Sequence, residues 1–135
     1  MRAWHELFSR RGAAPQPAAS KEELHIRIVE SVRELSIEEW LLLAYCVQRN
    51  QQTIALDVVH PAAGALVAKG LLARSGSIND GAAWPYTVPQ FIWEHLQERP
   101  RLLFEIRGIA PDDAELETNL GRLDKYLMKF DAVER

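Results

Sequence analysis

Three features are scarce in this sequence: cysteine, long apolar runs and excess positive charge. The single cysteine, Cys46, excludes an internal disulfide and a cysteine-based metal cluster, and it favours a reducing, intracellular setting. No run approaches the ~18–20 apolar residues that cross a bilayer, and the first residues lack the apolar stretch of a secretory signal. The net charge of −3 gives no overall attraction to nucleic acid or anionic lipid. The sequence therefore predicts a cytoplasmic protein in which any binding to DNA or membrane depends on a local patch.

Motifs of catalysis and of metal binding are missing as well. The sequence has no glycine-rich phosphate loop, no Gly-x-Ser-x-Gly elbow and no Cys–His signature. Cys46 has no basic neighbour in sequence to stabilise a thiolate, so it is expected to be a small buried hydrophobe. The histidines lack the i, i+4 pairing of a metal site, and each is expected to cap a helix or lie at the surface: His5, His25, His60 and His95. We therefore expect a non-enzymatic protein without a metal or cofactor.

The chain divides into a leader and one domain. Residues 1–11 place Trp4, Leu7 and Phe8 close to one face of a short basic amphipathic helix, and residues 12–19 form an Ala/Pro linker. The leader either docks or frays, or it anchors the protein peripherally at the inner membrane face through those three side chains. The length of 135 residues and 47% hydrophobic content suit a single core. Residues 20–135 are therefore predicted to be one domain.

Helical patterns dominate this domain. Ser20 with Glu23, and Ser36 with Glu39, have the capping-box spacing, so helices are predicted to follow each serine, to about residues 34 and 50. The second helix is apolar almost all round, which is typical of a central helix. Further helices are predicted over residues 61–69, from residue 89 to about 99, over 101–110 (an ambiguous segment) and from residue 111 onward.

Short strands are predicted between these helices. The segments are 53–59, 71–75 and 84–88, the last two joined by a polar loop into a β-hairpin of the wing type. Gly70 supplies the left-handed stop that ends the helix before the hairpin. The final helix has a stripe of apolar residues that either docks on the domain itself or forms a dimer through residues 114–130: Leu116, Leu120, Leu123, Leu127 and Phe130.

The core module, residues 35–100, resembles a winged-helix domain, with a helix that ends in Lys-Gly followed by a strand and a wing. The fold class implied is mainly α (α+β), a winged-helix-like domain with a small β-hairpin wing and additional N- and C-terminal helices. Four segments are similar to the soluble domain of the superinfection exclusion protein B family: Leu35-Ser36-Ile37-Glu38-Glu39, Gln52-Thr53-Ile54-Ala55-Leu56, Val67-Ala68-Lys69-Gly70-Leu71-Leu72 and Pro85-Tyr86-Thr87-Val88. The resemblance implies a bacterial or prophage protein with a role in exclusion or defence.

The module offers little to read DNA. A recognition helix must present polar side chains to base edges, and the helix over 61–69 has only Lys69. Residues 35–100 hold four basic against six acidic side chains, a local net charge of −2, which disfavours phosphate contacts. If DNA were bound nevertheless, the contacts would be Lys69 and Arg74. A DNA-binding transcriptional regulator is therefore an alternative and not the leading hypothesis.

A protein interface is the preferred function of this module. Aromatic residues at the wing are typical interface anchors, although they also serve to close a core. Small residues on the helix over 61–69 allow another helix to approach closely. The expected contacts with a protein partner or a second copy are Trp84, Tyr86, Trp93, Ala62 and Ala65, with Leu120 and Leu127 if the last helix forms a dimer seam. Peripheral membrane attachment through residues 1–11 is a second alternative.

Overall fold

The computed structural model describes residues 20–57, 59–74 and 84–134, with side chains as far as residue 127. Its fold is mainly helical with one small antiparallel sheet, as the α+β pattern of the sequence predicts. The elements are α2 (Lys21–Arg33), α3 (Ile37–Gln48), β1 (Thr53–Leu56), α4 (Pro61–Ala68), β2 (Ala73–Arg74), β3 (Trp84–Thr87), α5 (Gln90–Glu98), α6 (Leu102–Arg107) and α7 (Ala114–Glu134).

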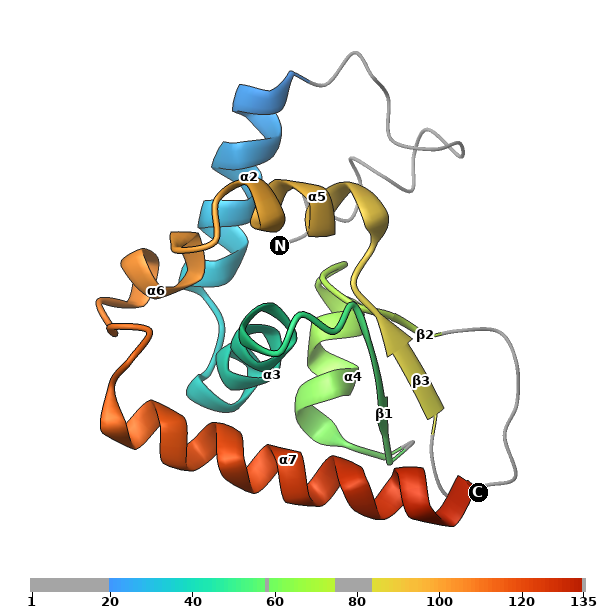
Figure 1. The fold of residues 1–135 in the computed structure, drawn as a ribbon. Helices are drawn as coiled ribbons and strands as arrows, with labels where there is room; N and C mark the ends of the chain where they lie inside the picture. The colour runs from blue at the N-terminus through green and yellow to red at the C-terminus, as the bar shows by residue number, and fades with distance from the viewer. Residues whose placement is uncertain (1–19, 58, 75–83, 135) are drawn as a thin grey trace.

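Helix α3 lies at the centre of the molecule, as its apolar sequence predicts, and packs against α4, α6 and α7 (Figure 1). Trp40 is fully buried, donates its indole N–H to the carbonyl of Leu103 at 3.0 Å, and meets Phe104 edge to face. Cys46 is also fully buried, and burial raises the pKa of its thiol to about 12. The prediction that Cys46 is a small buried hydrophobe is therefore confirmed.

The predicted helix ends are largely confirmed. Ser36 accepts the amide N–H of Glu39, and Glu39 accepts the amide N–H of Ser36, which completes the capping box of α3. Gly70 ends α4 with φ of 79°, the left-handed conformation that glycine adopts without strain. The amides of Leu71 and Leu72 then turn back to the carbonyl of Leu66. The strand predicted from residue 71 is wrong for its first two residues, because those amides are already bonded and β2 begins at Ala73.

The sheet has the strand order β1-β3-β2, and both pairings are antiparallel. Tyr86 lies opposite Ile54, and both side chains are buried in the core. On the other face, the hydroxyls of Thr53 and Thr87 hydrogen-bond across the strands at 2.9 Å. The pairing of the two predicted wing strands is thus confirmed, and the loop between them, residues 75–83, lies outside the described residues.

Helix α7 runs along the base of the molecule, beneath α3 and β1 (Figure 1). Asp113 accepts the amide N–H of Leu116 at 3.0 Å and so caps the helix start. Leu116, Leu120 and Leu127 are 3%, 0% and 9% exposed, and all three belong to the core of the same chain. The structure therefore has the arrangement in which the helix docks on its own domain. Leu120 and Leu127 are wrong as interface residues, because no partner can reach side chains that are already covered.

Candidate interaction surface

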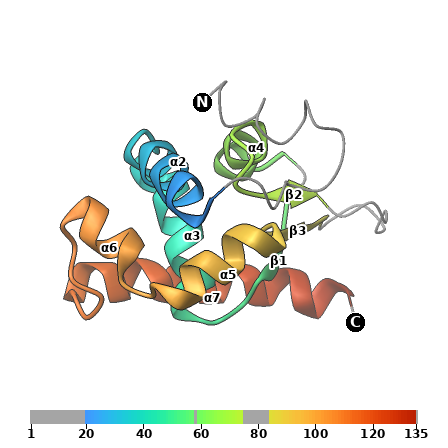
Figure 2. The same cartoon turned by 90° about the horizontal axis from the view of Figure 1, so that it is seen from above.

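Helix α4 begins with a histidine cap and a proline. His60 accepts the amide N–H of Ala63 through Nδ1 at 3.3 Å, and Pro61 occupies the first turn, where its missing N–H costs nothing. His60 therefore has the helix-cap role predicted for it. Its ring also meets Tyr126 of α7 edge to face, with 5.9 Å between the centroids. In Figure 2 the body of α4 lies at the edge of the molecule, and the contact between His60 and Tyr126 ties its start to α7.

Helix α4 has one buried face and one exposed face. Ala62, Ala63 and Leu66 are buried, so Ala62, at 8% exposure, is wrong as an interface residue. The residues of the opposite face lie at positions i, i+3, i+4 and i+7, the spacing of one stripe along a helix. We call it the α4 face; its members are exposed or half-buried and carry no polar side chain: Pro61, Gly64, Ala65 and Ala68.

Gly64 is a weak point of this helix that internal packing does not explain. A Cβ atom added at Gly64 would meet no atom within 4 Å. Glycine inside a helix costs about 0.5–1 kcal/mol relative to alanine, because the unfolded chain has more freedom to lose. The fold of the described residues therefore does not require glycine here, and the surface is left open to close approach from outside.

The two predicted DNA contacts are already engaged within the chain. Lys69 Nζ lies 2.7 Å from Glu39 Oε1, and both side chains are largely covered. Burial opposes the charge on Glu39, but the hydrogen bonds from Lys69 and from the Ser36 amide outweigh it and lower the pKa of this carboxyl. Arg74 lies over the ring of Trp84, 4.5 Å from its centroid. Lys69 would have to leave Glu39 to meet a phosphate, whereas Arg74 is exposed and its contact with Trp84 leaves its N–H groups able to donate.

The aromatic residues proposed as anchors divide between core and rim. Tyr86 is 2% exposed and is wrong as an interface residue, because it fills the core behind the sheet. Trp84 and Trp93 are half-buried and pack partly against that core. Val59 is 74% exposed just before α4, and the sequence did not mark it, because a β-branched residue there read as part of a strand.

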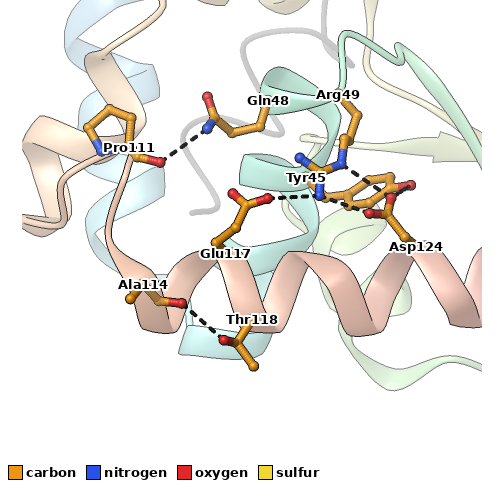
Figure 3. A network of polar contacts seen from close by, with 8 residues as sticks. All are labelled: Tyr45, Gln48, Arg49, Pro111, Ala114, Glu117, Thr118 and Asp124. Carbon is orange, nitrogen blue, oxygen red and sulfur yellow. Dashed lines mark hydrogen bonds and ion pairs between the residues drawn. The ribbon is translucent and has the colours of Figure 1, made fainter.

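A polar network fixes α7 to α3 (Figure 3). Asp124 accepts from the Tyr45 hydroxyl at 2.8 Å and from two nitrogens of Arg49 at 3.2 and 2.8 Å, a two-pronged contact. Glu117 lies 3.4 Å from the same guanidinium. Hydrogen bonds from Arg49 and then Tyr45 lower the pKa of Asp124, while burial and the bond to Asp124 raise the pKa of Tyr45. No sequence motif marks this network, because its members lie far apart in the chain.

Two histidines converge in the fold. His25 Nδ1 on α2 lies 3.0 Å from His95 Nε2 on α5, and the tautomers of the two rings decide which nitrogen donates. His95 is only 3% exposed, and the prediction of a surface or cap role for it is wrong. Burial, then the neighbouring Arg99 and His25, lower the pKa of His95. The described residues contain no group of three or more His, Cys, Asp or Glu side chains that could hold a metal ion.

Trp4, Leu7 and Phe8, the predicted membrane anchor, lie outside the described residues. Among the helices described, none combines the length and apolar character needed to cross a membrane. Attachment of the leader to a membrane surface stays a prediction.

Comparison with known proteins gives no relative for this chain. No protein-family model, no curated protein and no solved structure matches it. The function is therefore inferred from the residues and their geometry.

Proposed function

We propose that this chain is a winged-helix-like, non-enzymatic domain that binds another protein, or a second copy of itself, through the α4 face. Support for the winged-helix-like frame comes from the order of elements: two helices flank β1, and α4 then leads into a small antiparallel sheet. In a winged-helix frame, the position of α4 in this order would be that of the recognition helix in a DNA-binding domain.

The observation that carries the proposal is the chemistry of the α4 face. Reading base edges needs Arg, Lys, Asn or Gln side chains, and the α4 face has proline, glycine and alanine. Small residues lower the distance at which two helices can pack. The exposed Val59 beside the start of α4 adds apolar area to the same region. Protein contact is the binding mode that such a surface favours.

Sedimentation equilibrium of the full chain over a range of concentrations tests self-association. Gly64→Leu is expected to weaken the association at least tenfold, since the added side chain projects from the α4 face, while the far-ultraviolet circular dichroism spectrum is unchanged. Gly121→Ala, on α7, is the control and should leave it unaltered. An association that Gly64→Leu does not weaken would contradict the use of this face.

If the chain is monomeric, the partner is another protein. A photo-crosslinking residue at Ala68 should then capture one defined protein from cells, and the same group at Glu105, which is exposed on α6, should not. Equal capture from both positions would argue against the α4 face.

Binding to DNA is tested separately. Fluorescence anisotropy with mixed genomic fragments at low salt should show no binding that depends on both salt and sequence. Retention that weakens steeply with salt and depends on sequence would favour the DNA-binding alternative and refute the proposal.

The resemblance to the superinfection exclusion protein B family extends the proposal to a role in phage exclusion or defence. Its support is the four sequence segments named above. Expression of the chain in a bacterial host should lower the plating efficiency of a superinfecting phage, and Gly64→Leu should restore it. Unchanged plating with the wild-type chain would count against this role.

A further inference from the structure

A second surface, on the far side of α3 from its contact with α4, contains a pocket of about 270 Å³. It lies where the first turn of α3 meets the segment that joins α6 to α7 and the first turns of α7. The residues that define its character are Ile37, Leu41, Ile109 and Leu116, which are apolar, and Asp113 and Glu115, which are acidic.

The volume of the pocket lies at the lower end of the range of small-molecule sites, about 300–1,000 Å³. It has room for an apolar side chain of a bound protein segment. Ile37 stands at its rim and is 46% exposed, one of the few large apolar side chains that the described residues leave open. A side chain inserted here would cover Ile37 and gain apolar contact.

The charged residues that line the pocket have one sign. Among its described lining residues, two are carboxylates and none is basic. From Gly108 to Gly121 the chain has four acidic residues and no basic one. Glu117 is paired with Arg49 and Asp113 caps α7, but Glu115 has no ion-pair partner among the described residues. Arg122, about two turns beyond Glu115, donates to Asn119 of the pocket lining and has no other polar contact among the described residues.

From this combination we infer that the pocket binds a protein segment that presents one bulky apolar side chain beside arginine or lysine. The apolar side chain enters between Ile37 and Ile109, and the basic side chain pairs with Glu115 at the rim. Charge complementarity selects this occupant over an acidic or neutral segment. The site is separate from the α4 face, so either can fail in experiment without the other.

The probe is the capped pentapeptide Gly-Arg-Leu-Arg-Gly, titrated into the ¹⁵N-labelled full chain and followed by nuclear magnetic resonance. Saturable shifts are expected at the amides of Leu41, Ile109 and Asn119, weakening as salt is raised. Two matched peptides, Gly-Glu-Leu-Glu-Gly and Gly-Arg-Ala-Arg-Gly, should bind at least fivefold more weakly. Shifts that do not saturate, or equal binding of the acidic peptide, would overturn the inference.

Matched variants locate the site. Glu115→Lys should weaken binding at least fivefold, whereas Glu22→Lys, at the same position of the first turn of α2, changes the helix charge equally and should have no effect. Ile37→Glu should likewise weaken binding, and Ile26→Glu, on a side chain of similar exposure outside the pocket, should not. All four positions are exposed, so folding is retained. Equal losses in a variant and its control would refute the pocket as the site.

Discussion

Helices α4 and α7 both carry an apolar stripe, of small side chains on α4 and of leucines on α7, but the chain uses the two stripes differently. Leu116, Leu120 and Leu127 of α7 are buried on the side of α3 and β1. Asp124 fixes the helix to α3 through Arg49 and Tyr45. Among the described residues, three members of the α4 face are exposed and Ala65 is half-buried. The described polar contacts of α4 lie at its two ends, at His60 and Lys69.

The difference shows that apolar periodicity alone does not identify an interface. A stripe of large side chains gains most when it is covered, and α7 is long enough to be covered by its own domain. A stripe of alanine and glycine gains little from burial in the core, so it can stay at the surface without much cost. The α4 face is therefore the better candidate for contact with a partner.

The strongest test of this contrast is Leu120→Asp in α7. Leu120 is fully buried, so a carboxylate there is expected to prevent folding, and Leu120→Ala should lower the free energy of unfolding by about 2–5 kcal/mol. Urea denaturation of both variants measures the loss. A folded, newly monomeric Leu120→Asp protein would place α7 at an interface instead.

The clamp on α7 should contribute less than its apolar side. Asp124→Asn is expected to lower the free energy of unfolding by about 1 kcal/mol, because the pair is partly exposed and solvent screens it. The pKa of Asp124 is lowered in the folded state, so its contribution is complete above the ordinary value of 3.8 and is lost as the pH falls below it. Between pH 7 and pH 3, the free energy of unfolding should therefore fall less in Asp124→Asn than in the wild-type chain, as measured by denaturation at the two pH values. Asp112→Asn, exposed and next to the capping residue, is the control.

Gly64→Ala should have the opposite sign. The added Cβ meets no atom within 4 Å, so the free energy of unfolding is expected to rise by about 0.5–1 kcal/mol, measured by thermal denaturation. Gly121→Ala, where the added Cβ also meets no atom within 4 Å, should raise the free energy of unfolding by a similar amount. A fall in the free energy of unfolding for Gly64→Ala but not for Gly121→Ala would mean that the α4 face is covered within the chain.

The smallest expected effect concerns the contact between the start of α4, at His60, and Tyr126 of α7. Burial lowers the pKa of His60, so the folded state binds a proton on this ring less tightly than the unfolded state does. The contribution of neutral His60 to the free energy of unfolding is therefore complete above the ordinary pKa of 6.5 and is lost as the pH falls below it. His60→Asn keeps a capping oxygen without titrating. In His60→Asn the melting temperature should fall less between pH 7 and pH 5 than in the wild-type chain. The part of the fall that comes from His95 should remain. An unchanged slope would contradict the assigned role.

Local chemistry in the sequence was sufficient for much of this fold. Ser36 with Glu39 predicts the start of α3, and Gly70 predicts the end of α4, since each signal needs only three or four neighbouring residues. The apolar run through Cys46 predicts a buried central helix, because no polar face is available to meet water. These features do not depend on which distant element lies alongside.

Tertiary packing alone decided the rest. Arg49 and Asp124 are 75 residues apart, and His25 and His95 are 70 apart, so no spacing rule relates them. The sequence also left open whether Leu120 faces its own domain or a partner, because a helical stripe looks the same in both cases. Whether Leu120 is buried by its own domain or by a partner depends on which surface packs against α7. Within this chain α3 and β1 provide that surface.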